Sequence, residues 1–488
     1  MAVAVENSPP CRTLQVTAGN LKNGHLYVRD LDGFLPDDVL GSSRKSIGQG
    51  EGIEIVLDGL GESVITDVPR DSRSGKSRGF LRSRASVRRF FDHHHLKVGA
   101  TLRLERLATR RYRLSVEPIA RQAPRAAEFF SGIGLVRVAL EQEGWRVVFA
   151  NDIAQDKAQI YETNWPEHAH LVVGDIHGLD PIAIPDCELY TASFPCNDLS
   201  IAGRWDGLHG KESSAFWGLI RLLEEKGGAR PPLVLIENVV GFLLRNGGED
   251  LHQALRALNE VGYNVDAVVL NAANWTPQSR ARLFIVAKLF ANDAKRVTAN
   301  QSDLRPDSLC RFINLNPDID WDIQTLPPLP SRHIQLPDII ERLDDDDSQW
   351  WSDDRTAYFL SQLSVKHAEQ AAAMIRGRSY SYATAFRRVR NGKSMAELRT
   401  DGIAGCLRTP RGGSGRQILF VAGRNRYRVR LLTARECARL QGVPEDYVID
   451  VPLNQALFGF GDAVCVPAVA WLARHYLTPS INHHLTQR

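Results

Sequence analysis

Hydrophobic and polar residues alternate along roughly the first 120 residues, in short segments that glycine and aspartate interrupt. These segments are residues 25–31, 52–60, 63–68, 101–107 and 111–118. A repeat of two residues is typical of strands with one buried face. The pattern predicts a small, mostly β domain over residues 1–122.

A different rhythm begins near residue 123. Apolar segments of strand length now alternate with amphipathic helical segments such as residues 135–144 and 154–165. The apolar segments are residues 125–130, 147–152, 188–194, 233–239, 265–272 and 282–289. Strands that alternate with helices indicate βαβ units, so we expect a mostly parallel sheet in a doubly wound α/β domain.

Residues 291–425 break this rhythm with the segment LPPLP, an acidic run at Asp344–Asp347 and the basic segment AFRRVRNGK. Helical apolar patterns return from residue 426. We therefore expect a second domain, inserted over 291–425 into a sheet domain that 123–290 and 426–488 form together.

Composition narrows the class of protein. The chain has 488 residues, of which 43% are hydrophobic and 24% charged, and a net charge of +3 gives no global argument for a nucleic-acid partner. Its seven cysteines are scattered without metal-ligand spacing, which favours a reducing cytoplasm and no metal site. The first residues lack the pattern of a signal peptide, and no apolar run has membrane length. We expect a cytoplasmic monomer with no membrane partner.

Three consecutive predicted strands end in residues suited to a nucleoside ligand. Phe129, Ser131, Gly132, Ile133 and Gly134 form a glycine-rich turn between a strand and a helix. Asp152 and Asp175 follow the next two strands, and a carboxylate there can accept hydrogen bonds from a ribose diol. A glycine-rich turn is often only a tight connection, so the two acids carry the inference. The lack of a Walker lysine argues against ATP.

Two further strand ends carry reactive side chains. Cys196 follows Pro195 at the exit of residues 188–194, and Glu237 closes residues 233–239. A cysteine near a strand is usually an inert small hydrophobic residue, and a terminal acid can simply cap a helix. Together they form a plausible nucleophile and proton donor. Arg280 and Arg282 share one face of the next strand, either as a solvated edge or as a holder of an anion or carbonyl.

These segments, taken in chain order, resemble the cytosine-C5 DNA methyltransferase family of bacterial restriction-modification systems. The resemblance rests on FSGIG, the acid in NDI, GDI, FPCNDLS, ENVVGF, QSRARL, RLLTARECARLQGVP and GFGDAV, across residues 127–478. It implies a Rossmann-like methyltransferase domain that binds S-adenosylmethionine, with a target-recognition domain in the inserted region.

The resemblance also assigns roles to individual residues. Cys196 matches the nucleophile, Glu237 the catalytic glutamate and Arg282, with Arg280 beside it, the arginine flanking the base. The cofactor positions are Phe129, Ser131, Gly132, Ile133, Gly134, Asp152, Ile153, Asp175, Ile176, Pro195, Asp462, Ala463 and Val464. Two positions depart from the family's common pattern: Asn197 stands where glutamine is more frequent, and Asp462 where asparagine is, which puts a side-chain contact from Asp462 in doubt.

The chemistry of the family explains these residue types. Thiolate addition at C6 of cytosine activates C5 for methylation, and a glutamate at N3 absorbs the developing charge. The cytosine must leave the duplex to be reached. We expect residues 196–214, with Gly203, Gly207 and Gly210, to be a mobile closing segment.

The inserted region suits double-stranded DNA. Expected contacts come from Arg387, Arg388, Arg390, Arg408, Thr409, Arg411, Gly412, Gly413 and Ser414, since arginine reads guanine edges and glycine allows close approach. The alternative for each arginine is a phosphate contact only. Asp344–Asp347 is expected to be a solvated face turned away from DNA, and Trp350 and Trp351 to be packing residues rather than base wedges.

The amino-terminal domain has a basic cluster of its own. Residues 70–89 contain eight lysines and arginines against one acid, and Arg78, Arg82 and Arg84 are the expected DNA contacts. The segment from 76 to 107 faintly resembles plant and restriction-enzyme B3-like DNA-binding domains. The alternative is a structural extension that packs on the catalytic domain. His93–His95 lacks partner ligands with zinc spacing and is interpreted as surface.

Three rival functions stay open from sequence alone. The first is an RNA (tRNA) cytosine-C5 methyltransferase, which shares these motifs, although the long insertion and the basic domain favour DNA. The second is a catalytically inactive DNA-binding relative, against which the intact Cys196, Glu237 and Arg282 argue. The third is a restriction partner acting through the amino-terminal domain. A cognate restriction endonuclease acting on the same site is a possible partner.

Overall fold

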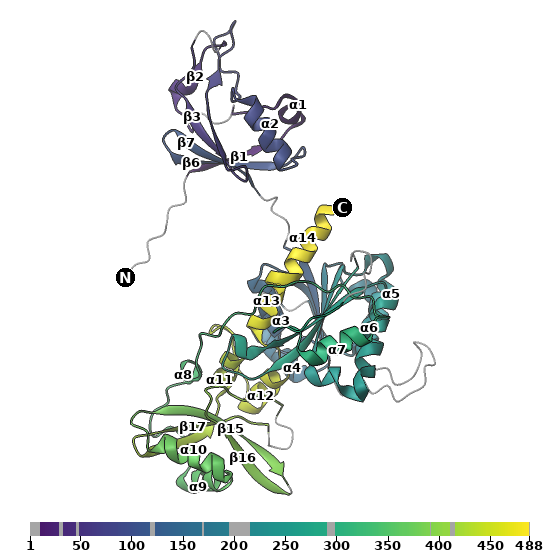
Figure 1. Cartoon of the computed structure of the whole chain (residues 1–488), viewed down its shortest axis with the longest axis vertical. Helices are drawn as coiled ribbons and strands as arrows, with labels where there is room; N and C mark the ends of the chain where they lie inside the picture. Colours follow the sequence, from purple (N-terminus) through teal and green to yellow (C-terminus); the bar gives the residue numbers. More distant parts are fainter. Residues whose placement is uncertain are drawn as a thin grey trace. The chain divides into compact units, whose positions relative to one another are not determined.

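The computed structural model describes residues 10–28, 33–44, 48–117, 123–167, 170–194, 215–289, 298–390, 392–409 and 415–487. The chain divides into two compact units, Met1–Gln122 and Ala123–Arg488 (Figure 1). Each unit has its own hydrophobic core and is described by itself.

The amino-terminal unit is a twisted sheet with two helices, as the period-two pattern predicts. Its strands are β1 (Cys11–Gln15), β2 (Leu40–Gly41), β3 (Ile53–Leu57), β4 (Glu62–Thr66), β5 (Val68–Pro69), β6 (Thr101–Ala108) and β7 (Arg111–Glu117). Five form the sheet β1-β6-β7-β3-β4, and β2 pairs with β5. The helices are α1 (Ala18–Asn23) and α2 (Arg84–His93), and Val87, Phe90 and Phe91 of α2 join the core. Residues 25–28, expected as part of a strand, form only the bridge Tyr27–Phe80.

The larger unit is built on a seven-stranded sheet with the order β10-β9-β8-β11-β12-β14-β13. Its strands are β8 (Arg125–Phe129), β9 (Arg146–Asp152), β10 (Leu171–Val173), β11 (Leu189–Ala192), β12 (Leu233–Val239), β13 (Asn264–Asn271) and β14 (Ala281–Lys288). The strand β14 runs antiparallel to both of its neighbours, β12 and β13, whereas the pairs from β10 to β12 are parallel. This is the Rossmann-like α/β fold that the sequence predicts, with the strand order reversing between β8 and β11.

Helices cover both faces of this sheet. One core gathers α3 (Leu135–Gln142) with the late helices α11 (Ala434–Leu440), α12 (Leu453–Asp462) and α13 (Val466–Leu472). The other gathers α5 (Ala215–Lys226), α6 (Glu249–Glu260) and α7 (Asp307–Leu315). Figure 1 shows the yellow α13 beside α3, so the last part of the chain packs on the helix that follows the first strand of the large sheet. The remaining helices are α4 (Gln155–Asn164), α8 (Leu336–Ile339), α9 (Asp353–Ser361), α10 (Val365–Ile375) and α14 (Thr478–Gln487).

Within the described residues, one helical run is long and apolar enough to cross a membrane, Leu453–His484. Because 78% of its apolar window is buried inside the protein, core packing accounts for its composition.

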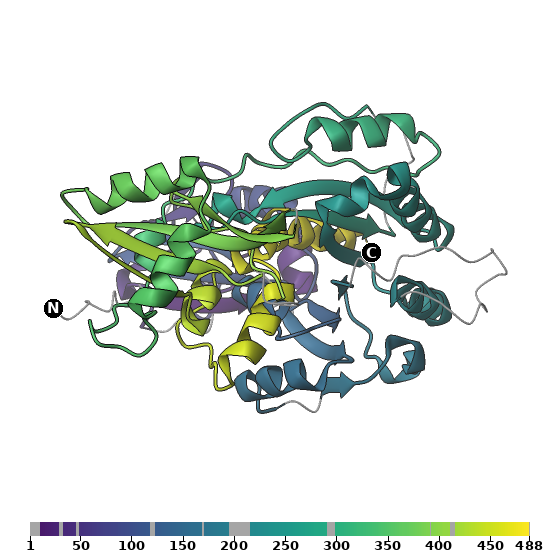
Figure 2. The same cartoon turned by 90° about the horizontal axis from the view of Figure 1, so that it is seen from below.

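A small antiparallel sheet, β16-β15-β17-β18, forms the inserted part. Its strands are β15 (Ser381–Arg390), β16 (Lys393–Arg399), β17 (Ile418–Gly423) and β18 (Arg426–Leu431). The helices α9 and α10 pack on one of its faces through Phe359 and Ala371 (Figures 1 and 2). Trp351 packs edge-on against Phe359, and Arg430 lies over the ring of Trp350, which agrees with the packing role expected for both tryptophans.

The packing does not follow the expected limits of the insertion, 291 and 425. The Leu304 carbonyl accepts a hydrogen bond from Val269 of β13, and the Asp320 carbonyl accepts one from Val265. Leu309 and Phe312 of α7 lie in the hydrophobic core of the large sheet domain. Residues 299–324 therefore extend the large sheet domain, and the small sheet continues to Leu431. In the acidic run, Asp345 pairs with Arg428 of β18.

Candidate active site

The parallel strands of the large sheet end at one edge, where the strand order reverses between β8 and β11. Crevices at such a reversal bind ligands in open α/β sheets. Residues from four strand ends, β8, β9, β11 and β12, meet there together with the turns that follow them. The FSGIG motif follows β8, the acid of the NDI motif ends β9, and Glu237 lies near the end of β12.

The glycine loop, residues 130–134, leaves β8 in a left-handed backbone conformation. Phe130, Gly132 and Gly134 have φ of 57°, 55° and 78°. A side chain on Gly132 would meet open space, with Lys157 Cδ 3.9 Å away, whereas one on Gly134 would lie 2.4 Å from the Trp165 ring. Gly132 therefore borders free volume at the crevice, and Gly134 allows close packing of the loop on α4.

The two adjacent phenylalanines have different environments. Phe129 is 1% exposed and packs against Phe149 and Tyr190 in the core. Phe130 is half-buried at the start of the loop, edge-on to Phe194. The ring that borders the crevice thus belongs to Phe130, which the sequence reasoning passed over, and the expected ligand contact from Phe129 is not supported.

Asp152 at the end of β9 orients the glycine loop. Its carboxylate accepts hydrogen bonds from the amides of Gly132 (2.7 Å) and Ala154 (2.8 Å). The next side chain, Ile153, is 68% exposed and so leaves an apolar surface accessible beside the glycine loop. Asp175 is exposed and accepts from the His177 amide (2.9 Å), and Ile176 is buried in the core beneath it.

The turn after α12 closes the same edge. Asp462 forms an ion pair with Lys157 of α4 at 2.8 Å. Ala463 is half-buried and Val464 is buried in the core. Asp462, which departs from the family's common asparagine, thus makes a charged contact with Lys157 where an asparagine could offer only a neutral acceptor.

Buried polar atoms cluster under the glycine loop. Among the described residues, Ser131 Oγ, Thr191 Oγ1 and both carboxylate oxygens of Glu128 are buried without a hydrogen-bond partner. Glu128 and Thr191 are register partners on neighbouring strands β8 and β11. Burial raises the pKa of Glu128 to about 8. Buried polar groups are rarely left unpaired, so this cluster suits a ligand that supplies partners.

The exit of β11 leads to the expected nucleophile. Phe194 is buried, and its carbonyl accepts a hydrogen bond from the Asn238 side chain of β12 at 3.2 Å. Pro195, Cys196 and Asn197 lie outside the described residues, as does the rest of the expected closing segment to residue 214. Asn238 thereby fixes the point from which that segment starts.

Glu237 and Arg282 form an ion pair at this edge, with Nε 3.0 Å from Oε1. Their strands are antiparallel neighbours, and Arg282 lies opposite Val239, two residues from Glu237. Both side chains are mostly buried, with Glu237 10% and Arg282 16% exposed. A buried, paired carboxylate has a fixed direction, as a proton donor or acceptor at a strand end requires.

The side chain of Arg280 is buried beneath the site, where it binds backbone carbonyls. The residue is 2% exposed, and its guanidinium donates to the carbonyls of Leu407 (2.8 Å), Gly461 (3.0 Å) and Ala463 (2.6 Å). It also contacts Cys406 Sγ at 3.3 Å. Arg280 therefore joins the turn after α12 to residues 404–409, which we call the strap.

The strap connects the small sheet to the active-site edge. Ala404 bridges to Gln278, and the Leu407 amide donates to the Gln278 side chain at 3.0 Å. A side chain on Gly461 would lie 2.6 Å from the strap backbone at Arg408 and Thr409. The glycine in the GFGDAV motif is thus required for close packing on the strap.

Comparison with known proteins decides the family. The family model described as C-5 cytosine-specific DNA methylase matches residues 125–477. The chain belongs to the C-5 cytosine-specific DNA methylase family. The match covers both parts of the large sheet domain and the small sheet between them.

Individual relatives agree with this assignment. The chain is 29% identical over 349 residues to Type II methyltransferase M.NgoBI of Neisseria gonorrhoeae, covering 70% of this chain and 89% of that protein. It is 26% identical over 350 residues to Type II methyltransferase M.HhaI of Haemophilus parahaemolyticus, covering 72% and 93%. The crystal structure of S. pombe Dnmt2 methyltransferase is similar with a TM-score of 0.49 at 20% identity, covering 74% and 99%. We take the family from the model match alone.

In this C-5 cytosine methylase, the expected DNA-reading arginines of β15 point to opposite faces of the small sheet. Arg387 donates to the Gln362 side chain (3.0 Å) and lies over Trp351, on the face that the helices cover. Arg388 is exposed, 3.9 Å from Glu397. Arg388 therefore remains a candidate DNA contact, whereas Arg387 is engaged inside its own domain. Nothing is described of the side chain of Arg390.

On the strap, Arg408 is exposed and Thr409 half-buried. Arg411, Gly412, Gly413 and Ser414 lie outside the described residues.

In the amino-terminal unit, Arg82 forms a mostly buried ion pair with Asp67 at 2.5 Å and also donates to the Ser42 carbonyl. Arg78 is 42% exposed and lies 3.8 Å from Asp71, and Arg84 is exposed beside His25. Arg82 thus stabilises its loops, and Arg78 and Arg84 remain accessible.

Proposed function

We propose that this chain transfers a methyl group from S-adenosylmethionine to C5 of a cytosine within one specific sequence of double-stranded DNA. The observation that carries the proposal is the Glu237–Arg282 pair beside the exit of β11, at the edge that holds the glycine loop. In support of it, Glu237 is on β12, the neighbour of the strand β11 that leads to the segment containing Cys196, and Arg282 of β14 pairs with Glu237. An RNA substrate is less favoured, because the matched family is a DNA methylase family.

The residues at the loop fit S-adenosylmethionine. Its adenosine would be held by the ring of Phe130, the exposed Ile153 and the acids Asp152 and Asp175. Its methionine ammonium would supply hydrogen bonds to the unpaired oxygens of Glu128, Thr191 and Ser131. When bound, the cofactor supplies a methyl group on a sulfonium, which an activated cytosine C5 can accept.

The chain's own residues would activate the base. The Cys196 sulfur adds to C6, and the electron pair moves toward N3, where Glu237 supplies a proton or a strong hydrogen bond. Arg282 orients Glu237 and can bind the cytosine carbonyl. After C5 has taken the methyl group, a base removes the C5 proton, Cys196 leaves as the thiolate and the proton on N3 returns to Glu237. The cytosine must be extruded from the duplex for these contacts to form.

Three measurements test this function. Bisulfite sequencing of plasmid DNA from cells that express the chain should find methylated cytosines within one short motif. DNA containing 5-fluorocytosine in that motif should form a stable covalent adduct, because the fluorine cannot leave as the proton does. The Cys196→Ala variant should form no adduct and transfer no methyl group while still binding DNA. Methylation by Cys196→Ala, or of a tRNA in preference to duplex DNA, would contradict the proposal.

The target site would be read from the small sheet and the strap. The residues proposed to contact it are Arg388, Arg390, Arg408, Thr409 and residues 411–414. We propose further that a cognate restriction endonuclease shares this site, as the Type II names of the relatives suggest. DNA methylated by the enzyme should then resist one endonuclease of matching specificity.

A second function, for the amino-terminal unit, is favoured by a polar cavity of about 610 Å³. Its walls include His25, Phe80, Arg78 and Arg84, and the rings of His25 and Phe80 stack in parallel, 3.9 Å apart. Burial and the neighbouring Arg84 cation lower the pKa of His25. We propose that this face binds DNA phosphate, because it has more accessible arginines than acidic residues.

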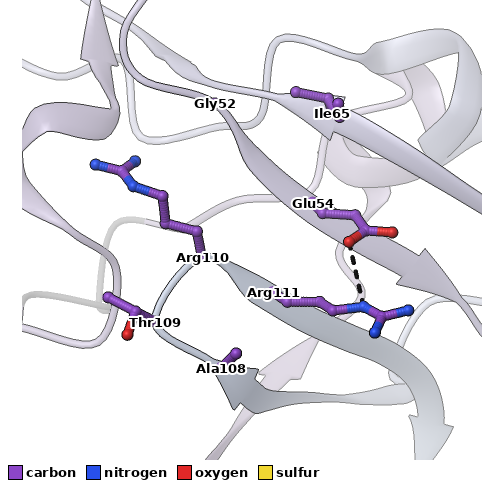
Figure 3. A pocket seen from close by; sticks show the side chains of 7 residues that line it. All are labelled: Gly52, Glu54, Ile65, Ala108, Thr109, Arg110 and Arg111. Carbon is purple, nitrogen blue, oxygen red and sulfur yellow. Dashed lines mark ion pairs between the residues drawn. The ribbon is translucent and has the colours of Figure 1, made fainter.

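The other cavity of this unit provides a matched control. It measures about 550 Å³ and is lined by Glu54, Arg110 and Arg111, with Gly52, Ile65, Ala108 and Thr109 (Figure 3). Both of its arginines pair with acids, Arg111 with Glu54 at 3.2 Å and Arg110 with Asp38, whereas in the first cavity Arg78 lies 3.8 Å from Asp71 and Arg84 contacts His25. Paired arginines release fewer counterions on contact with phosphate.

The salt dependence of DNA affinity separates the two cavities. In the full chain, Arg78→Ala with Arg84→Ala should reduce the slope of log affinity against log salt by about two, since each phosphate contact contributes about 0.9. Arg110→Ala with Arg111→Ala should leave the slope unchanged. Equal slopes for wild type and both double variants would exclude DNA contact at the first cavity.

A further inference from the structure

Two buried guanidiniums meet one carboxylate at the active-site edge. Arg280 and Arg282 both extend into the space between β14 and the strap, and Glu237 pairs only with Arg282. Within the part of the chain that the structure describes, the other hydrogen-bond acceptors of Arg280 are the neutral carbonyls of Leu407, Gly461 and Ala463. Taken as ionised groups, these side chains leave one positive charge uncompensated in a mostly buried site. An unpaired buried charge is strongly destabilising.

The group placed between the two arginines is Cys406. Its sulfur lies 3.3 Å from Nη1 of Arg280 and 3.9 Å from Nη2 of Arg282. As a thiol it can donate only to the Leu407 carbonyl, at 3.3 Å, which Arg280 already engages. As a thiolate it accepts from both guanidiniums and supplies the missing negative charge.

We propose that Cys406 is a positioning residue that acts as a thiolate counter-charge, holding Arg280 and Arg282 in the arrangement that orients Glu237. The role in catalysis rests on the proposed methyl transfer, whereas the charge state of Cys406 does not. Cys406 would act through Arg282 and would not touch the cytosine.

The electrostatic surroundings agree with this arrangement. Despite burial, the charges of Arg280 and Arg282 and their hydrogen bonds lower the pKa of Cys406 below its ordinary value. Burial and the neighbouring Arg282 lower the pKa of Arg280, as expected where positive charge is in excess. Cys465, which also faces Arg280, is different: burial raises its pKa to about 11, so it stays a thiol.

Three substitutions separate charge from packing. Cys406→Ala and Cys406→Ser remove the anion, and the serine nearly preserves the size. Cys406→Asp supplies a fixed anion of slightly larger size. If charge decides, alanine and serine should both lower kcat about tenfold with the KM for DNA within about twofold of wild type, because a misdirected carboxylate impairs the chemical step. Aspartate should restore kcat to within about threefold of wild type.

A stability measurement needs no reaction. A group whose pKa is lowered in the folded state contributes stability that is fully present above its unfolded pKa and is lost as pH falls through its folded pKa. The thermal stability of the wild type relative to Cys406→Ser should therefore increase as pH rises from 6 to 9. Relative to Cys406→Ser, the Cys406→Asp variant should gain a nearly constant amount over that range. Cys310→Ser, at a thiol whose pKa burial raises, is the control and should show no such increase.

The outcomes are distinct. If serine matches wild type and aspartate is the worst variant in both kcat and stability, Cys406 is a packing residue and the proposal is wrong. If the wild type does not methylate cytosine but the pH-dependent stability difference appears, the proposed function is wrong, whereas the proposal that Cys406 is a thiolate is supported. If the stability difference does not change with pH, Cys406 is not a thiolate, and the proposal is wrong whatever the rate of methyl transfer.

Discussion

Glu237 and Arg282 meet at 3.0 Å on neighbouring antiparallel strands, although the helix α6 and the strand β13 lie between them along the chain. The pair fixes the direction of a carboxylate at the edge where β11 ends. Because Arg282 is also close to Cys406, the carboxylate, the two arginines and the strap form one connected set. A change in one member should therefore affect the others.

This connection predicts non-additive kinetics. Glu237→Gln should lower the single-turnover rate of methyl transfer by about 10² to 10⁴, the usual contribution of a general acid or base. Arg282→Ala should lower it through the same carboxylate. The double variant should then be little slower than the slower single variant. Rates that multiply in the double variant would show that the two residues act independently.

The two glycines of the glycine loop should respond differently to alanine. Gly134→Ala places a methyl group 2.4 Å from Trp165, so it should reduce thermal stability markedly, and Trp165→Ala should partly restore it. Gly132→Ala meets open space, so it should cost stability only through its positive φ while weakening the binding of S-adenosylhomocysteine. Thermal denaturation and calorimetric titration would measure both effects. Similar stability losses at the two positions would contradict the assignment of free volume to Gly132.

Glu128 predicts a pH dependence of stability. Burial, the largest cause, raises its pKa to about 8 from an ordinary value of 4.5. Between these values the folded protein keeps a proton that the unfolded chain has lost, so this group's contribution to stability falls as pH rises from about 4.5 to about 8 and is constant above. Glu128→Gln should remove that decline. Melting temperatures of both proteins between pH 6 and pH 9 would show it, and parallel curves would refute it.

A buried ion pair secures the small sheet to the catalytic core. Arg430 and Glu436 are both fully buried, with Nη1 2.7 Å from Oε2, and Glu436 also accepts from the Thr433 amide at 2.9 Å. Glu436→Gln should destabilise the protein by about 3–5 kcal/mol, since it leaves a buried charge without its partner.

The exposed pair Arg439–Glu445 is the control for that prediction. Glu445→Gln should cost less than about 1 kcal/mol, because solvent screens exposed ion pairs. Chemical denaturation of both variants gives the comparison. A small loss at Glu436 would mean that hydrogen bonds, rather than charge, hold the helix α11 in place.

The amino-acid sequence alone predicts the class of the fold and the order in which the candidate site residues follow the strands. Period-two segments gave the amino-terminal sheet, and alternating strand and helix patterns gave the Rossmann-like domain, because burial on one or both faces imposes those repeats on the chain. Asp152, Asp175 and Glu237 were found because side chains that follow parallel strands meet at one edge.

Tertiary structure decided which of several equivalent residues takes part. Phe129 and Phe130 are alike in sequence, but only packing against Phe149 shows that Phe129 is internal. Alternation places Arg387 and Arg388 on opposite faces, and only the position of α9 and α10 shows which face is covered. The limits of the insertion were likewise set by hydrogen bonds from β13 to residues 304 and 320.

Cys406 shows most clearly what the sequence alone cannot predict. Along the chain it is one of seven scattered cysteines, and no neighbouring residue indicates a charge partner. Its environment is made by Arg280 and Arg282, more than 120 residues earlier, once the strap packs on β14. A local pattern reports burial and secondary structure, whereas the balance of buried charge depends on groups that only the folded chain brings together.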